Sequence, residues 1–102
     1  MSDRLPARQQ FVENLASVFT VRTAAGAIVP LELAEVQQGR AAPGFEQFSV
    51  LFRGPREPLL PQMTYPMAHP ALGEFALFIV PVSGGEAGFV YEAVFSTKLP
   101  GS

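Results

Sequence analysis

Residues 45–54 read FEQFSVLFRG, and this stretch decides the fold class. Every second residue in its central part is large and apolar, and these residues share one side of the chain: Phe48, Val50 and Phe52. The other side carries Ser49, Leu51 and Arg53. A period of two residues is typical of a β-strand, in which successive side chains point to opposite faces. The segment predicts a strand with one buried face, which ends at Gly54-Pro55 because proline cannot extend the hydrogen-bonded ladder.

The same alternation recurs through most of the chain. It predicts strands over residues 18–23, 27–36, 72–82 and 89–97, with a brief extended piece at 63–67. Ala25-Gly26 predicts a turn between the first two strands, and residues 37–44 read as a loop. The three glycines within residues 83–88 predict a hairpin that joins the last two strands.

Two of these strands carry features that bear on their place in a sheet. Pro30 has no backbone N–H, so the strand over residues 27–36 is predicted to be an edge strand or to contain a bulge at Pro30. The strand over residues 72–82 is apolar on both faces, which favours a central strand covered on both sides.

A helix is indicated only near the N-terminus. Ser2 or Asp3 is predicted to cap it, and Pro6 is tolerated in a first helical turn. An apolar stripe at helical spacing follows, formed by Phe11, Val12, Leu15 and Phe19. One short helix and many short strands indicate a mainly β fold, a small antiparallel β-sandwich or barrel of about five to seven strands. We expect a single β domain over residues 1–102.

The composition excludes several classes of partner. A formal net charge of −2 argues against nucleic acid as the main partner. The chain has no Cys, which excludes disulfides and Cys-ligated zinc. The longest apolar stretch, residues 75–82, is far shorter than the ~20 residues of a membrane-spanning helix. No secretory signal is visible, so we expect a cytoplasmic protein that binds neither nucleic acid nor membrane.

Few residues are suited to catalysis. His69 is the only histidine, and metal sites need several ligands, so we expect no metal and no cofactor. We favour a turn or side-chain-to-backbone role for His69 over general-base catalysis. The serines at 17, 49, 83 and 96 lie outside any Gly-x-Ser-x-Gly elbow, although a Ser-His-Glu arrangement stays geometrically conceivable. Glu32 and Glu35, three residues apart on a predicted strand, should lie on opposite faces. We therefore expect no catalytic residues.

Arg53 and Glu92 are charged residues in strands that are otherwise apolar. If the two strands are neighbours, these side chains can pair across a face that also carries Leu51, Val90 and Val94. We favour a face that is covered by the N-terminal helix or a loop, with the pair partly buried. The alternative is an exposed apolar patch with a charged centre, which is the usual composition of a protein contact surface.

The connection over residues 54–71 is predicted to be one long loop that contains Gln62, Tyr65 and His69. Their polar ends can either tie the loop to the backbone of the strands or present a recognition surface. Together with Arg53 and Glu92, these three residues are the candidates for binding.

Five segments carry a resemblance to a known family: residues 48–55, 60–65, 69–73, 78–82 and 91–95. In this order they resemble a bacterial family of small proteins that is classed only as a domain of unknown function, the 6916 family. Members are often encoded near phage-tail-collar-like, microcystin-dependent proteins, so the resemblance implies an accessory role in a tail-like or fibre-like assembly. The family has no assigned catalytic residues to carry over.

Two functions from different classes follow. The first is a non-enzymatic structural or protein-interaction module that binds a protein partner or associates with itself. The alternative is a small-ligand-binding protein or hydrolase that uses His69 with Tyr65 and a Glu, for which a chain of this size leaves little room.

Overall fold

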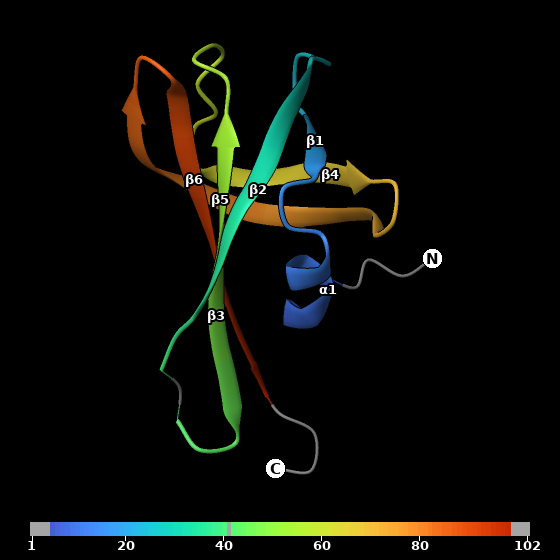
Figure 1. Ribbon diagram of the computed structural model, residues 1–102. Helices are drawn as coiled ribbons and strands as arrows, with labels where there is room; N and C mark the ends of the chain where they lie inside the picture. Colours follow the sequence, from blue (N-terminus) through green and yellow to red (C-terminus); the bar gives the residue numbers. More distant parts are fainter. Residues whose placement is uncertain (1–4, 41, 99–102) are drawn as a thin grey trace.

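The structure is a computed structural model that describes residues 5–40 and 42–98 (Figure 1). Six antiparallel strands form one closed barrel in the ring order β1-β2-β3-β6-β5-β4. They are β1 (Val18–Arg22), β2 (Ile28–Gln38), β3 (Phe45–Gly54), β4 (Met63–His69), β5 (Gly73–Gly85) and β6 (Gly88–Lys98). The predicted mainly β fold, a small antiparallel β-sandwich or barrel with one short helix, is confirmed, and of the two architectures the barrel is the one present.

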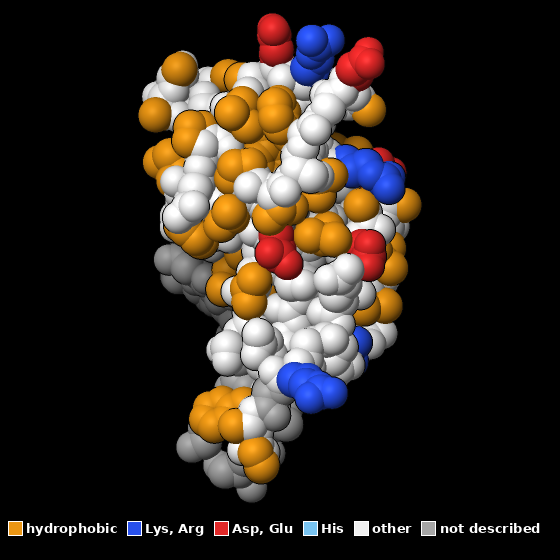
Figure 2. Space-filling view, turned by 90° about the vertical axis from the view of Figure 1, so that its left-hand side faces the viewer, with side chains coloured by type: hydrophobic (Ala, Val, Ile, Leu, Met, Phe, Trp, Pro, Cys, Tyr) orange, Lys and Arg blue, Asp and Glu red, His pale blue; other side chains and the backbone are white. Residues whose placement is uncertain are grey.

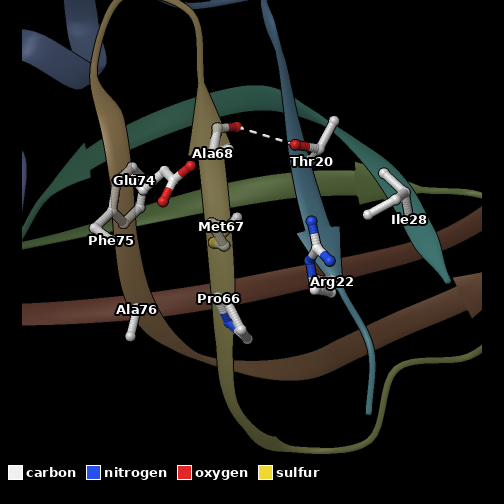
Figure 3. A pocket seen from close by; sticks show the side chains of 9 residues that line it. All are labelled: Thr20, Arg22, Ile28, Pro66, Met67, Ala68, Glu74, Phe75 and Ala76. Atoms are coloured by element: carbon white, nitrogen blue, oxygen red, sulfur yellow. Dashed lines mark hydrogen bonds between the residues drawn. The ribbon is translucent and has the colours of Figure 1, made fainter. Parts of the chain in front are cut away.

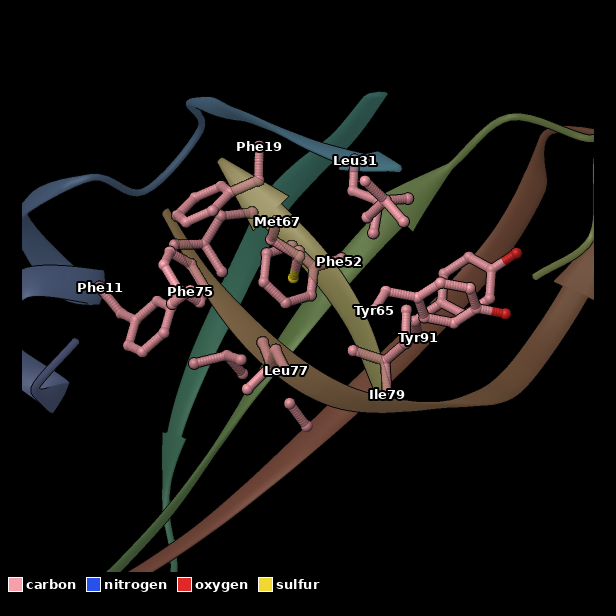
Figure 4. Packing of buried hydrophobic residues seen from close by; sticks show 14 of the residues in the cluster. Phe11, Phe19, Leu31, Phe52, Tyr65, Met67, Phe75, Leu77, Ile79 and Tyr91 are labelled. Carbon is pink, nitrogen blue, oxygen red and sulfur yellow. The ribbon is translucent and has the colours of Figure 1, made fainter. Parts of the chain in front are cut away.

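The inward side chains of all six strands fill the inside of the barrel and form the core (Figure 4). On β3 the buried residues are Phe48, Val50 and Phe52, as the alternation in the sequence predicts. Aromatic rings make up much of the core, and Phe48 stacks on Phe95 with the ring centroids 4.6 Å apart. The barrel therefore encloses a packed interior, which is how small barrels of this strand number are filled.

β2 lies inside the ring with a neighbour on each side, so the prediction of an edge strand is wrong. The N–H of Leu33 donates to the carbonyl of Ser17, the residue before β1, and alternate residues of a strand face the same neighbour. The nitrogen of Pro30 therefore points to the β3 side, where pairing begins only at Glu32 and Arg53. Pro30 is tolerated because its missing N–H lies beyond the end of that ladder.

The bulge in β2 lies between Leu33 and Glu35 instead of at Pro30. The extra residue shifts the phase of the alternation, so Glu35 stands opposite Leu51 on the outside of the barrel. Glu32 stands opposite Arg53 on the same outer face. The prediction that Glu32 and Glu35 occupy opposite faces is wrong, because it assumed an unbroken strand.

β5 is covered on one face only, which corrects the prediction of a strand buried on both sides. Phe75, Leu77 and Ile79 point into the core, whereas Phe78 on the outer face is 48% exposed. The predicted hairpin to β6 is confirmed by the pairing of Gly85 with Gly88.

β1 and β4 close the ring through two residue pairs, Thr20 with Ala68 and Val21 with Met67. Pro66 and Pro70 lie two residues to either side of Ala68, so they belong to the same edge of the chain, and neither has an N–H to donate. The ladder therefore stops on both sides of Ala68, and this seam is the shortest in the barrel.

The helix α1 (Arg8–Glu13) closes one end of the barrel with a single fully buried side chain, that of Phe11. Its ring lies 5.4 Å from that of Phe95, measured between centroids. The predicted stripe is shorter than expected, because Leu15 follows the helix and is exposed, and Phe19 belongs to β1. The predicted caps Ser2 and Asp3 lie outside the described residues.

The opposite end of the barrel is closed by residues 55–62, which cross from β3 to β4 on the far side of the ring (Figure 1). The side chain of Leu60 is buried there. The predicted loop over residues 54–71 is too long, since β4 occupies Met63–His69 and pairs with β5 along its whole length. The extended piece predicted at residues 63–67 is present and is two residues longer than expected. Proline prevented a helix in this segment and did not prevent a strand.

Candidate functional site

Four outward side chains of β3 and β6 form a compact group at the centre of one sheet face. Leu51 pairs in register with Glu92, and Arg53 pairs with Val90. The four residues therefore stand at the corners of a quadrilateral, with two apolar side chains on one diagonal and two opposite charges on the other. We call Leu51, Val90, Arg53 and Glu92 the central quartet.

Exposed apolar side chains surround the central quartet on β5 and β6. Val94 is 61% exposed, and Val82 on β5 is 49% exposed. Figure 2 shows hydrophobic side chains gathered over the upper part of the side that faces left in Figure 1, with acidic side chains near the centre and further charged side chains at the top and right-hand edges. We call the outward surface of β3, β6 and β5 the apolar face.

Within residues 5–40 and 42–98 neither the helix nor a loop covers the apolar face, which contradicts the preferred expectation. α1 sits at the end of the barrel, where Phe11 enters the core, and its Arg8 Nε lies 3.1 Å from Glu46 Oε2. The arrangement that the structure supports is the alternative one, an exposed apolar patch with a charged centre.

Arg53 has a different ionic partner from the expected one. Its Nη1 atom lies 4.0 Å from Oε1 of Glu32 on β2, and the two side chains are 68% and 46% exposed. Between the described residues there is no ion pair from Arg53 to Glu92. A contact this long and this exposed contributes little to stability, so Arg53 is held only loosely.

His69 lies on β4, with its ring buried against Phe19 at a centroid distance of 4.4 Å. The backbone N–H of Ala71 donates to its Nδ1 at 3.0 Å. Its Nε2 lies 2.9 Å from Oγ of Ser17, and the Ser17 hydroxyl donates to the carbonyl of Asn14. The expected side-chain-to-backbone role of His69 is thus present in the structure, with a link to the segment between α1 and β1.

The direction of these hydrogen bonds opposes a catalytic Ser-His pair. Because Nδ1 accepts from the backbone, the proton of the neutral ring resides on Nε2, and Nε2 donates to Ser17. A nucleophilic serine requires the reverse, an Nε2 that accepts the hydroxyl proton. Burial also lowers the pKa of His69 from its ordinary value of 6.5, which keeps the ring neutral at pH 7. The contact between Ser17 and His69 joins positions far apart in the sequence, and no motif pointed to it.

Tyr65 and Gln62 do not join His69 in a site. Tyr65 and His69 both belong to β4, four residues apart, which separates them by about 13 Å along the strand. The hydroxyl of Tyr65 donates to the carbonyl of Pro61 at 2.6 Å, and burial, with a smaller contribution from Tyr91, raises its pKa. Gln62 is exposed just before β4. The structure therefore separates the three residues that the sequence placed in one loop.

A groove of about 480 Å³ lies on the outer surface near the β1–β4 seam (Figure 3). Pro66 and Ala68 of β4 form part of its lining. Figure 3 shows Arg22 and Glu74 on opposite sides of β4. The groove contains neither His69 nor Tyr65, so it offers no acid–base pair from the expected set.

The described residues contain no cluster of metal ligands and no unpartnered buried polar side chain. Within residues 5–40 and 42–98, no three His, Asp or Glu side chains gather closely enough to hold a metal ion. Every buried side-chain nitrogen and oxygen in the same part of the chain has a hydrogen-bond partner. No helix found there is both long and apolar enough to cross a lipid bilayer.

The sequence matches one family model, described as a domain of unknown function (DUF6916), over residues 6–95. No curated protein and no solved structure matches the chain. Since the match covers most of the chain, from just before α1 to near the end of β6, the protein belongs to this family.

Proposed function

We propose that this domain is a non-enzymatic protein-interaction module, because it exposes an apolar sheet face and belongs to a family with no assigned activity. Its contact surface is the apolar face, centred on the quartet of Leu51, Val90, Arg53 and Glu92. The observation that carries the proposal is the exposure of large apolar side chains on adjacent strands, led by Val94 at 61%. Soluble monomers keep such contiguous patches small, and larger ones mark contact sites.

The shape and rigidity of the scaffold support this function. β3 and β6 share ten residue pairs, so the apolar face stands on the longest ladder of the barrel. Side chains presented by a paired ladder are held in place before a partner arrives, which reduces the entropy lost on binding. The charged residues in the middle of the face add orientation and selectivity to apolar contact.

The polar chemistry of the chain also favours binding over catalysis. His69, the only imidazole, uses both ring nitrogens in hydrogen bonds to Ala71 and Ser17. A hydrolase that used His69 with Tyr65 and a Glu would need these groups around one reacting atom, and β4 holds Tyr65 about 13 Å away. An accessory role in a tail-like or fibre-like assembly is included in the proposal and is supported by the family resemblance.

A pair of matched valine substitutions tests the use of the apolar face. Val94 on β6 and Val18 on β1 are both exposed, at 61% and 50%, and their strands are opposite each other in the ring. We expect Val94→Lys to lose at least tenfold in affinity for a partner, because it buries a charge in an apolar contact. Val18→Lys should bind as the wild type does.

The measurement is a binding titration of each purified chain against itself and against the proteins encoded by adjacent genes. Equal binding by the wild type, Val94→Lys and Val18→Lys would exclude the apolar face as the contact surface. If the wild type bound neither itself nor these proteins, and a substrate turnover dependent on His69 were found, the domain would be an enzyme.

A further inference from the structure

We propose that the partner of the apolar face is a second copy of this chain, related by a two-fold axis that brings Arg53 of each copy against Glu92 of the other. This inference rests on the proposed function and names its partner. It is carried by the arrangement of charges in the central quartet.

The quartet is self-complementary. Neighbouring strands lie about 4.8 Å apart, and residues on the same face repeat at about 6.8 Å along a strand, so the four side chains stand at the corners of a short rectangle. One diagonal joins Leu51 to Val90 and the other joins Arg53 to Glu92. A two-fold axis in the plane of the interface, which crosses the Arg53–Glu92 diagonal at its midpoint and at right angles to it, exchanges the two charged positions and returns each apolar position to within about 3 Å of itself. Each copy thus places its cation on its partner's anion and its apolar residues on their own equivalents.

Both charges are available for a second partner. Glu92 has no ion pair within the described part of the chain. The 4.0 Å contact from Arg53 to Glu32 leaves the Arg53 side chain 68% exposed. Apolar contact around the quartet would exclude water from Arg53 and Glu92. Their attraction would then be stronger, because the local dielectric constant is lower.

A second copy fits this face better than a strongly charged partner does. The quartet carries one positive and one negative charge and so attracts no partner of a single sign. An interface of standard size buries about 800 Å² on each side, which is about one eighth of the 6420 Å² surface of the chain. The outer side chains of three adjacent strands, which include Phe78, Val82 and Val94, supply an apolar border for such an area.

A charge-exchange experiment tests the proposal by sedimentation velocity over a series of concentrations. We expect the wild-type chain to dimerise, and the single variants Arg53→Glu and Glu92→Arg to dimerise at least tenfold more weakly, because each homodimer would contain two like-charge contacts. An equimolar mixture of the two variants should restore the dimer. In that mixed pair, Arg53 faces Glu92 at one contact and the two substituted residues attract each other at the second.

Each other outcome overturns the inference. These outcomes are a wild type that stays monomeric at millimolar concentration, single variants that dimerise like the wild type, and a mixture that stays monomeric while both variants are folded.

Thermal unfolding checks that each variant is folded. Val94→Lys with its control Val18→Lys provides a second pair of variants that leaves the quartet intact. A monomeric chain that binds another protein in a manner sensitive to Val94→Lys would refute the dimer and keep the proposed function. A monomer that binds nothing would refute both.

Discussion

The hydroxyl of Tyr91 accepts a hydrogen bond from the backbone N–H of Leu60 at 2.9 Å, in the buried interior. A side chain of β6 thereby fixes the crossing segment between β3 and β4 over the end of the barrel. The side chain of Leu60 fills the same end, so the hydrogen bond and the apolar packing act on one point of the chain.

Removal of this hydroxyl should be costly. In Tyr91→Phe the buried N–H of Leu60 loses its acceptor, and an unsatisfied buried donor costs about 1–3 kcal/mol. The free energy of unfolding from urea denaturation measures the loss. Tyr65→Phe is the matched control, because the Tyr65 hydroxyl donates to Pro61 in a partly buried position and leaves behind only a carbonyl that water can reach. We expect the smaller loss there, and an equal loss in the two variants would contradict the importance of burial at Leu60.

Phe11 should contribute more to stability than Leu15, the other large side chain of the predicted stripe before β1. Its ring is fully buried among Phe19, Phe48 and Phe95, so Phe11→Ala leaves a large cavity and should cost about 3–5 kcal/mol. Leu15, which the sequence places on the same stripe, is 43% exposed, and Leu15→Ala should change stability by less than about 0.5 kcal/mol. The pair is compared by thermal and urea unfolding, and similar losses would place the helix differently on the barrel.

The alternation of side chains predicts most of the barrel, because the buried face of a strand is written in every second residue. β3 has the predicted bounds, and Phe48, Val50 and Phe52 are buried as expected. Alternation fails where a single residue interrupts it. The bulge after Leu33 leaves no mark in a run of Leu, Ala, Glu and Val, so the outward position of Glu35 could not be foreseen.

The candidate site is predicted in part. The sequence placed Leu51, Arg53, Glu92 and Val90 on one face, and the register of β3 and β6 confirms that they are neighbours. The sequence did not show whether anything covers these four residues. The position of α1 depends on which end of the barrel Phe11 fills, and the sequence pattern does not reveal that end. The outward apolar residues of β5, such as Phe78, were assigned to a second buried layer, since sequence pattern alone does not distinguish a covered apolar face from a binding surface.

Gly88 at the β5–β6 hairpin should not tolerate a side chain. Its φ is +130°, and a Cβ built there would collide with the carbonyl oxygen of Gly54. Strain of this backbone region together with that clash predicts a loss of more than about 2 kcal/mol for Gly88→Ala. Gly85, its paired residue, has open space around the same position. Gly85→Ala should lie within about 1 kcal/mol of the wild type in urea unfolding, and an equal loss at both positions would contradict the collision with Gly54 as the cause.

The β1–β4 seam should be the first part of the barrel to open. Two residue pairs close it, whereas ten join β3 to β6. Amide hydrogen exchange should therefore be faster for Ala68 than for Val50 and Ala93, which are paired with each other in the longest ladder. Pro66→Val gives β4 an N–H opposite Arg22 and should slow exchange at Ala68. Exchange at Ala68 as slow as at Val50 in the wild type would show that the seam opens only with the whole barrel.

The stability of the fold should fall as the pH drops through the range in which histidine titrates. Burial lowers the pKa of His69 in the folded chain from the ordinary value of 6.5 that applies to the unfolded chain. Above pH 6.5 the His69 ring is neutral in both the folded and the unfolded chain, so its full contribution to the free energy of unfolding is present. As the pH falls below 6.5, the unfolded chain binds a proton first, so the free energy of unfolding decreases until the folded-state pKa is passed. Protonation of Nδ1 also removes the acceptor for the N–H of Ala71, which adds a physical reason for the folded ring to stay neutral.

Urea unfolding between about pH 8 and about pH 5 should show this decrease in the free energy of unfolding in the wild type and a flatter profile in His69→Gln. Parallel profiles for the two chains would mean that His69 titrates alike in the folded and unfolded states.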